Sequence, residues 1–444
     1  MDEQKSALFI DRFVDLTPSG HQVETSQQLG DLLEKKDLTY RAVFITADQP
    51  GISPIRELRR IREKLPFSSV FFVYDEVKPL ADVMIRRMGV QSQIQRAVVP
   101  VIVTQFDNAH AQIEVPLQKA LELRSDRVKR GKSTAEPVPL PGFKPVRIES
   151  LLNDAPLVFD VHVIIPGPQR IKVFAANDPP DLDRILKYIS EGIYWVYVRE
   201  SSLNSCLSYC GFIATTLMSN KDVSLEVKYL HLANETGKLL EKLSPTTLLD
   251  TEKLLGNIQD LLVSKNHDPE DVIRLFFKHL KLVEHALNVT LVTGLMSKNL
   301  GLSSVKTREQ LGFASLLHDV GLMKLPEHLQ TQEQSGFAPD EQKVYEAHCE
   351  ASVEILSSLG ITDTAVLQAV AQHHERFDNS GYPKSADSSE VHLFAELIGI
   401  GDDLTVFMKR NSETDRKAAL QKFSNQMTNH FSLAVIDSFN RTFL

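Results

Sequence analysis

Apolar and polar positions in the first 124 residues alternate between short hydrophobic runs and amphipathic stretches. Such a series indicates βαβ units, and the strands of these units form a parallel sheet. The first domain, residues 1–123, is therefore expected to be an α/β domain. Its expected strands are 7–11, 40–48, 69–75 and 96–103, and its expected helices are 23–36, 53–65, 77–89 and 109–124.

Residues 124–143 interrupt this pattern with basic residues and three prolines, as is typical of a linker. A second, smaller unit follows at 144–222, where the pattern predicts a small α+β module. Its expected strands are 158–165, 169–176 and 193–200, and its expected helix is 181–192. Cys206 and Cys210 are four residues apart in an apolar helix, a spacing that favours a packed core face over a ligand pair.

From residue 223 to residue 444 the apolar positions recur every three or four residues, which is the period of amphipathic helices. The stretch 239–264 is the clearest example. We therefore predict a multidomain chain that ends in an all-α helical bundle.

Composition narrows the function classes. The 444 residues carry a formal net charge of −9, which argues against a nucleic-acid polymer or an anionic membrane as partner. Three cysteines are too few for a disulfide framework. The start of the chain shows no basic segment followed by an apolar one, and no apolar run reaches the length of a membrane helix, about 20 residues. A cytoplasmic protein without membrane insertion is expected.

Histidine is concentrated in the helical part, because ten of the fourteen histidines follow residue 266. A single histidine in an apolar helix is usually a hydrogen-bonded core residue, but several with aspartates suggest a metal site in the middle of a bundle. Each candidate lies in, or at the end of, an apolar helical run. The candidates are His285, His318, Asp319, His348, His373, His374 and Asp402.

Three features of this set resemble the HD-GYP family of metal-dependent phosphohydrolases. They are HDVGLMKLP at 318–326, the isolated His348, and HHERFDNSGYP at 373–383. The resemblance implies a helical HD-GYP domain over 223–444 in which all seven candidates bind two divalent metal ions, with His318 and Asp319 at the catalytic centre. It also implies substrate contacts from Lys324, Arg376, Gly381, Tyr382 and Pro383.

Imidazoles and carboxylates without thiolates favour iron or manganese over zinc. Asp319 is the natural bridging ligand, and two ions activate water and neutralise charge on a phosphodiester. Two positions depart from the family. Leu322 replaces a lysine that can hold a substrate phosphate, and Lys281 replaces a glutamate that some members use for a third ion.

The first domain resembles the receiver domain of two-component signalling, but it lacks the acids of that family. Only Asp11, followed by Arg12, stands where receivers carry an acidic pair, and Thr46 occupies the phosphoacceptor position four residues before Pro50. We therefore predict a pseudo-receiver that docks signalling proteins or dimerises.

Two functions from different classes follow. The first is a bacterial cyclic di-GMP phosphodiesterase that yields pGpG and GMP, or the same chemistry on a related cyclic dinucleotide. The second is a degenerate HD-GYP protein that binds a cyclic dinucleotide or a protein partner and signals without turnover. Leu322 favours the second function, and the complete ligand set favours the first.

Overall fold

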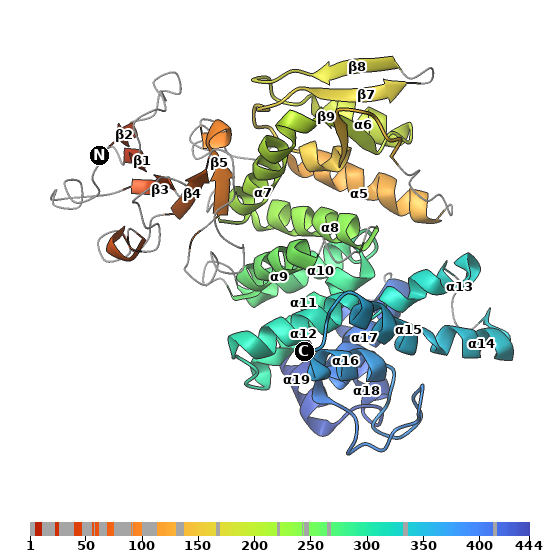
Figure 1. Ribbon diagram of the computed structural model, residues 1–444. Helices are drawn as coiled ribbons and strands as arrows, with labels where there is room; N and C mark the ends of the chain where they lie inside the picture. The colour runs from red at the N-terminus through yellow and green to blue at the C-terminus, as the bar shows by residue number, and fades with distance from the viewer. Residues whose placement is uncertain are drawn as a thin grey trace. The chain divides into compact units, whose positions relative to one another are not determined.

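The computed structural model divides the chain into two compact units, shown together in Figure 1. One unit contains Met1–Leu123 and Thr134–Val227, and the other contains Arg124–Ser133 and Lys228–Leu444. The structure describes residues 5–10, 23–25, 40–46, 56, 58–61, 69–74, 90, 92–99 and 113–444, except 130–136, 166–168, 220–222, 242, 244–247, 264–267, 332–335 and 412–414.

The N-terminal sheet has five parallel strands in the order β2-β1-β3-β4-β5. Phe44 on β3 and Phe72 on β4 are fully buried, as are their apolar neighbours along each strand. Continuous apolar strands of this kind are typical of a parallel sheet that is covered on both faces. The strands are β1 (Lys5–Ile10), β2 (Val23–Thr25), β3 (Tyr40–Thr46), β4 (Ser69–Tyr74) and β5 (Ser92–Gln95).

Two sequence expectations for this sheet are wrong. Residues 23–25 form strand β2 instead of the start of a helix, in keeping with the β-branched Val23 and Thr25. The sequence predicted a strand at 96–103. The structure instead has strand β5 ending at Gln95, and Arg96–Val98 form a 3₁₀ helix. The expected helix 77–89 lies outside the described residues. The strand order matches doubly wound sheets, while the receiver-like interpretation stays a prediction.

Helix α5 (Glu114–Lys129) continues six residues into the segment expected to be a linker. This segment contains good helix formers and no glycine or proline before Gly131. Two of its basic residues, Arg124 and Arg127, are buried. Arg124 donates a hydrogen bond of 3.1 Å to the backbone carbonyl of Asn234.

The middle module is a four-stranded antiparallel sheet in the order β6-β9-β7-β8. Strand β6 was not expected from the sequence, since Pro145 lies within it. Proline is tolerated there because β6 is an edge strand. The elements are β6 (Phe143–Arg147), β7 (Val161–Ile165), β8 (Gln169–Phe174), α6 (Leu182–Ser190), β9 (Trp195–Arg199) and α7 (Leu203–Ser219), which carries the buried Cys206.

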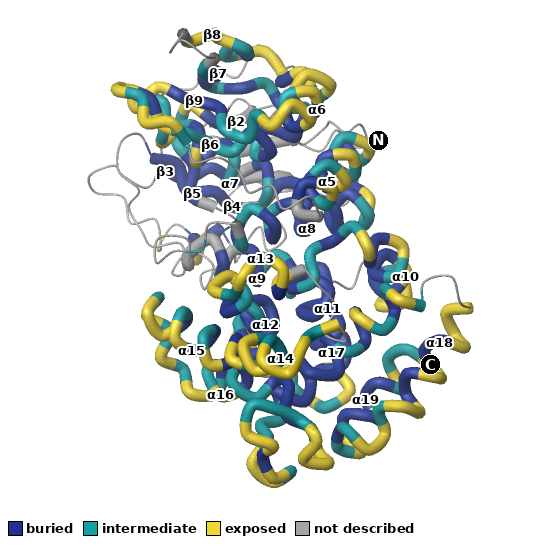
Figure 2. The backbone as a smooth tube through the Cα atoms, turned by 90° about the vertical axis from the view of Figure 1, so that its right-hand side faces the viewer, coloured by how far each residue is buried: buried dark blue, intermediate teal, exposed yellow. Residues whose placement is uncertain are grey.

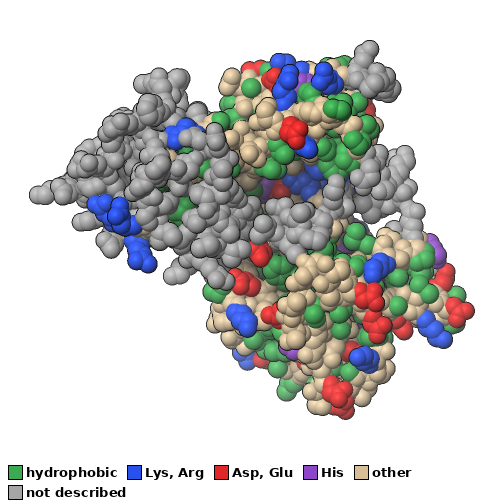
Figure 3. Space-filling view, in the orientation of Figure 1, with side chains coloured by type: hydrophobic (Ala, Val, Ile, Leu, Met, Phe, Trp, Pro, Cys, Tyr) green, Lys and Arg blue, Asp and Glu red, His purple; other side chains and the backbone are tan. Residues whose placement is uncertain are grey.

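The C-terminal unit is helical, as expected, and it is built around α11 (His285–Asn299). Eleven of the fifteen α11 residues are buried, and the helix packs against α9, α10, α12, α17 and α19 (Figure 2). On the visible face of this unit, basic and acidic side chains are interspersed (Figure 3). No helix in the described part of the chain is both long and apolar enough to span a membrane. The other helices are α8 (Leu225–Glu241), α9 (Leu248–Val263), α10 (Pro269–His279), α12 (Val305–Leu317), α13 (Glu327–Thr331), α14 (Pro339–Glu346), α15 (His348–Ser358), α16 (Thr364–Gln372), α17 (Leu393–Arg410), α18 (Arg416–Met427) and α19 (Leu433–Phe443).

Candidate metal centre

The structure brings the seven candidate ligands together from five helical elements. His285 begins α11, and His348 begins α15. His318 and His373 directly follow the last residues of α12 and α16, so Asp319 and His374 lie just beyond those helices. Helix ends place short side chains at the centre of the bundle, and Asp402 joins them from within α17.

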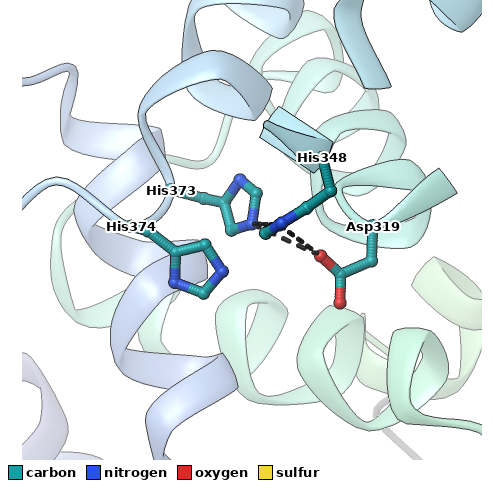
Figure 4. Close-up of side chains that lie close together, drawn as sticks. All are labelled: Asp319, His348, His373 and His374. Carbon is teal, nitrogen blue, oxygen red and sulfur yellow. Dashed lines mark hydrogen bonds and ion pairs between the residues drawn. The ribbon is translucent and has the colours of Figure 1, made fainter. Parts of the chain in front are cut away.

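Four of the ligands, Asp319, His348, His373 and His374, point toward one another in Figure 4, and their ligand atoms all lie within 4.8 Å of one another. Asp319 Oδ1 lies 3.2 Å from Nε2 of His348 and 3.4 Å from Nε2 of His373. We call these four residues the first ligand group.

A second ligand group contains His285, His318 and Asp319, again within 4.8 Å. Asp319 Oδ2 lies 3.4 Å from Nε2 of His318, and Asp402 Oδ1 lies 3.0 Å from Nε2 of His285. Asp319 therefore belongs to both groups and directs one carboxylate oxygen toward each. That arrangement is the one expected of a carboxylate that bridges two ions.

Backbone carbonyls fix the orientation of three imidazoles. Nδ1 of His318 lies 2.8 Å from the carbonyl of Ser315, and Nδ1 of His373 lies 2.7 Å from the carbonyl of Val370. His348 makes the same contact with Tyr345 at 2.6 Å. A carbonyl only accepts, so each Nδ1 carries the hydrogen. In the neutral ring, Nε2 then presents a lone pair to the centre, which is how metal-binding histidines are usually held.

His285 is oriented by a side chain instead of a carbonyl. The Thr405 hydroxyl donates to the carbonyl of Asp402 at 2.8 Å, so its oxygen accepts from Nδ1 of His285, 3.0 Å away. Nε2 of His285 is thereby left facing Asp402. Thr405 was not singled out by the sequence, because only the three-dimensional packing of α17 on α11 places it beside the ring.

The donor set fits metal ions. Among the described residues, Nε2 of His318 and Nε2 of His374 are buried without a hydrogen-bond partner, which is rare for buried polar atoms. Burial lowers the pKa of His318 to about 4 and lowers the pKa of His374, so both rings are neutral near pH 7. Burial opposes ionisation of Asp319, but neighbouring histidines outweigh it and hold the pKa of this carboxyl well below its usual range. Neutral imidazoles around an ionised carboxylate are the form that binds divalent ions.

Exposure of the ligands indicates the open side of the centre. The side chains of His285 and Asp319 are 27% and 20% exposed, whereas those of His318, His348 and His373 are fully buried. The centre is therefore open to solvent on the side of His285 and Asp319.

The Gly381–Tyr382–Pro383 turn packs directly on the ligand pair. The Tyr382 ring stacks on His374 with centroids 4.5 Å apart, and the Tyr382 amide donates to the carbonyl of His374. A Cβ at Gly381 would lie 2.3 Å from the same carbonyl, so only glycine fits there. The buried Glu375 holds the next part of the loop by accepting from the amides of Lys384 and Ala386. Glu375 was missed as a site residue, although its place directly after the two histidines was a signal.

Two residues that were expected to contact substrate form ion pairs within the protein. Lys324 forms an exposed ion pair with Glu354 at 3.0 Å, with both side chains about half exposed or more. Arg376 pairs with Asp403 at 2.9 Å, and its side chain is only 12% exposed. The expectation that Arg376 reaches substrate is therefore not supported by its position, because its charge is already paired inside the protein.

Residues 271–433 match the HD domain family. The helical unit carries an HD domain. The resemblance of this region to HD phosphohydrolases is thus confirmed, and the HD family is metal-dependent, in keeping with the His and Asp cluster.

Curated relatives of the HD domain are phosphodiesterases of cyclic dinucleotides. A cyclic di-GMP phosphodiesterase of Thermotoga maritima is 23% identical over 44% of this chain and 50% of its own length. The cyclic di-GMP phosphodiesterase response regulator RpfG of Xanthomonas campestris is 31% identical over 25% of this chain and 29% of its own. A 3′3′-cGAMP-specific phosphodiesterase 3 of Vibrio cholerae is 28% identical over 31% of this chain and 28% of its own. The chain thus spans half or less of the length of these relatives.

Among solved structures, Bd1817, described as an HDG"Y"P protein from Bdellovibrio bacteriovorus, aligns with a TM-score of 0.50. The alignment covers 67% of this chain and 98% of Bd1817 at 17% identity. This likeness supports the HD fold of the helical unit.

Proposed function

We propose that the HD domain hydrolyses a phosphodiester bond of cyclic di-GMP, giving pGpG and then GMP. The observation that carries this proposal is the position of Asp319, which belongs to both ligand groups and offers one oxygen to each. The relatives named as cyclic di-GMP phosphodiesterases supply the substrate class.

The residues support a centre for two iron or manganese ions. His348, His373 and His374 would hold one ion, His285, His318 and Asp402 would hold the other, and Asp319 would bridge them. When bound, such ions lower the pKa of water to make a nucleophile and stabilise charge on a phosphodiester. The protein contributes the orientation of the imidazoles and an open side at His285 and Asp319, where the scissile phosphate would enter. The stacked Tyr382 would stiffen His374 as a ligand.

A turnover assay tests the proposal. Protein loaded with Fe²⁺ or Mn²⁺ without oxygen is incubated with cyclic di-GMP, and pGpG is measured by chromatography. We expect product from the wild type and none from His318→Ala, which removes a ligand. Lys187→Ala is the control, because Lys187 belongs to the middle module and forms an exposed ion pair with Glu191. Absence of product from fully loaded wild type contradicts the proposal. Faster hydrolysis of 3′3′-cGAMP than of cyclic di-GMP would reassign the substrate within the same chemistry.

A second candidate function is favoured by Leu322. This half-buried leucine stands where the family lysine can hold a phosphate, and its amide donates to the carbonyl of Asp319. A signalling adaptor would bind cyclic di-GMP without hydrolysing it. Calorimetric binding by the loaded wild type, combined with no turnover by the wild type or by Leu322→Lys, would favour the adaptor. If the wild type is instead a slow enzyme, Leu322→Lys should raise kcat/KM about ten- to hundredfold, since a charge-assisted hydrogen bond contributes about 1.5–3 kcal/mol.

A further inference from the structure

Arg376 connects two parts of the metal centre that are far apart in the sequence. Its Nη1 donates to the carbonyls of His373 and Glu375 at 3.1 and 3.0 Å. Its Nη2 donates to both carboxylate oxygens of Asp403 at 3.0 and 2.9 Å. The two oxygens of one carboxylate lie side by side and share one hydrogen of Nη2, so Arg376 contacts three partners at once.

Each partner of Arg376 adjoins metal-ligand residues. His373 is itself a candidate ligand of the first group, and Glu375 directly follows the ligand His374. Asp403 follows Asp402, which faces His285 in the second group. Arg376 therefore links the turn that carries two residues of the first group to the helix that carries Asp402, which faces His285 of the second group.

The surroundings of Arg376 hold the guanidinium in place. The guanidinium carbon of Arg376 lies 5.1 Å from the centre of the Phe431 ring. A Cβ at Gly399 of α17 would lie 2.5 Å from the carbonyl of His373 and 3.1 Å from Nη1 of Arg376. The backbone of α17 thus approaches the His373 turn closely, and Arg376 fills the remaining space between them. A planar group whose donors point in fixed directions restricts this contact more than a flexible lysine could.

We propose that Arg376 is a positioning residue of the metal centre, which sets the spacing between the His373–His374 pair and Asp402 through its bonds to the backbone and to Asp403. This inference rests on the proposed two-ion centre. It replaces the expectation that Arg376 binds substrate. It also gives Asp403, which the sequence did not single out, a defined role.

Metal binding and electron paramagnetic resonance test this role without reference to turnover. The protein is stripped with a chelator and titrated with Mn²⁺. We expect the wild type to bind two ions, whose closeness gives the multiline spectrum of a coupled pair. In Arg376→Met and in Asp403→Leu, affinity for the second ion should fall about 10- to 100-fold, as is usual when a group that orients a ligand is removed. The coupled spectrum should be replaced by the six-line signal of isolated Mn²⁺.

Arg376→Lys covers the case in which Arg376→Met fails to fold, because it keeps the charge beside Asp403. Lysine cannot bond two carbonyls and two carboxylate oxygens in one plane, so we expect only partial rescue, with the second ion bound about tenfold more weakly than in the wild type. The matched control is Arg441→Met, which removes an arginine from an exposed ion pair with Asp437 on α19 and should bind like the wild type. Two ions bound with wild-type affinity and coupling in Arg376→Lys or Arg376→Met would overturn the positioning role. A wild type that binds no Mn²⁺ would instead contradict the two-ion centre.

Discussion

Nδ1 of His285 lies 3.0 Å from Oγ1 of Thr405, whose own hydrogen is donated to the carbonyl of Asp402. One hydroxyl thereby orients one ligand and bonds the backbone of another.

Thr405→Val keeps the shape of the side chain but removes the acceptor for His285. The ring then loses its preferred orientation, and we expect the affinity of the second ligand group for its ion to fall about 10- to 100-fold. A Mn²⁺ titration with measured stoichiometry checks this. Thr428→Val is the matched control, because Oγ1 of Thr428 also donates to a backbone carbonyl of the preceding helical turn, that of Ser424 at 3.0 Å. Equal affinities in both variants would contradict the role of Thr405.

Gly321 allows η7 (Val320–Lys324), the 3₁₀ turn after Asp319, to approach α15. A Cβ at this position would lie 2.1 Å from the carbonyl of His348 and 2.6 Å from the amide of Ser352. We expect Gly321→Ala to lower the free energy of unfolding by about 1–3 kcal/mol or more, since both neighbours are backbone atoms. It should also weaken metal binding by displacing His348. Gly211→Ala is the control, because a Cβ there meets nothing within 4 Å and alanine favours the helix. Thermal unfolding of both variants gives the comparison.

Metal binding should release a proton from His348. Burial opposes the charged form of this imidazole, but the hydrogen bond to Asp319 outweighs burial and raises the pKa of His348 to about 11. The metal-free protein therefore holds this proton at pH 7, and an ion that takes Nε2 must displace it. Apparent affinity should thus rise about tenfold per pH unit for this one proton below that pKa. Calorimetry in buffers of different ionisation heat measures the protons released. If His348→Ala releases as many protons on metal binding as the wild type, the assignment of this proton to His348 is wrong.

The first domain should not accept phosphate from small phosphodonors. Thr46 ends β3 and is buried, and a hydroxyl cannot form an acyl phosphate. Acetyl phosphate with Mg²⁺ is therefore expected to leave residues 1–120 unmodified by mass spectrometry. An aspartyl phosphate in that range would show that an acid such as Asp11 or Asp48, both outside the described residues, serves as acceptor.

The sequence predicted seven candidate ligands that the structure brings together, and four of them lie in two local motifs. His318 and Asp319 are adjacent, as are His373 and His374. Each pair lies at the end of one helix. Residues that act through tertiary contacts could not be predicted in this way. The sequence predicted that Arg376 contacts substrate, whereas the structure shows that it pairs with Asp403 of α17. Thr405 contacts His285 only because α17 packs on α11.

Secondary structure was likewise predicted correctly where the local pattern is clear and missed where it is short or depends on tertiary contacts. The buried strands β3 and β4 were predicted from continuous apolar runs. The short β2 was mistaken for a helix because three residues give too little pattern, and edge strand β6 was obscured by Pro145. The charged end of α5 looked like a linker, since a sequence does not show that Arg124 becomes buried.

The buried end of α5 decides where the chain can be divided for laboratory work. Arg124 bonds the carbonyl of Asn234, and its Nη1 lies 2.4 Å from where a Cβ of Gly237 would be, beside the Glu284 carboxylate that precedes His285. A fragment that begins at α8 would lack Arg124, so the carbonyl of Asn234 would lose this hydrogen bond and Glu284 would lose one nearby cation. A fragment of the helical unit that is meant to retain a native metal centre should therefore begin upstream of Arg124, within α5.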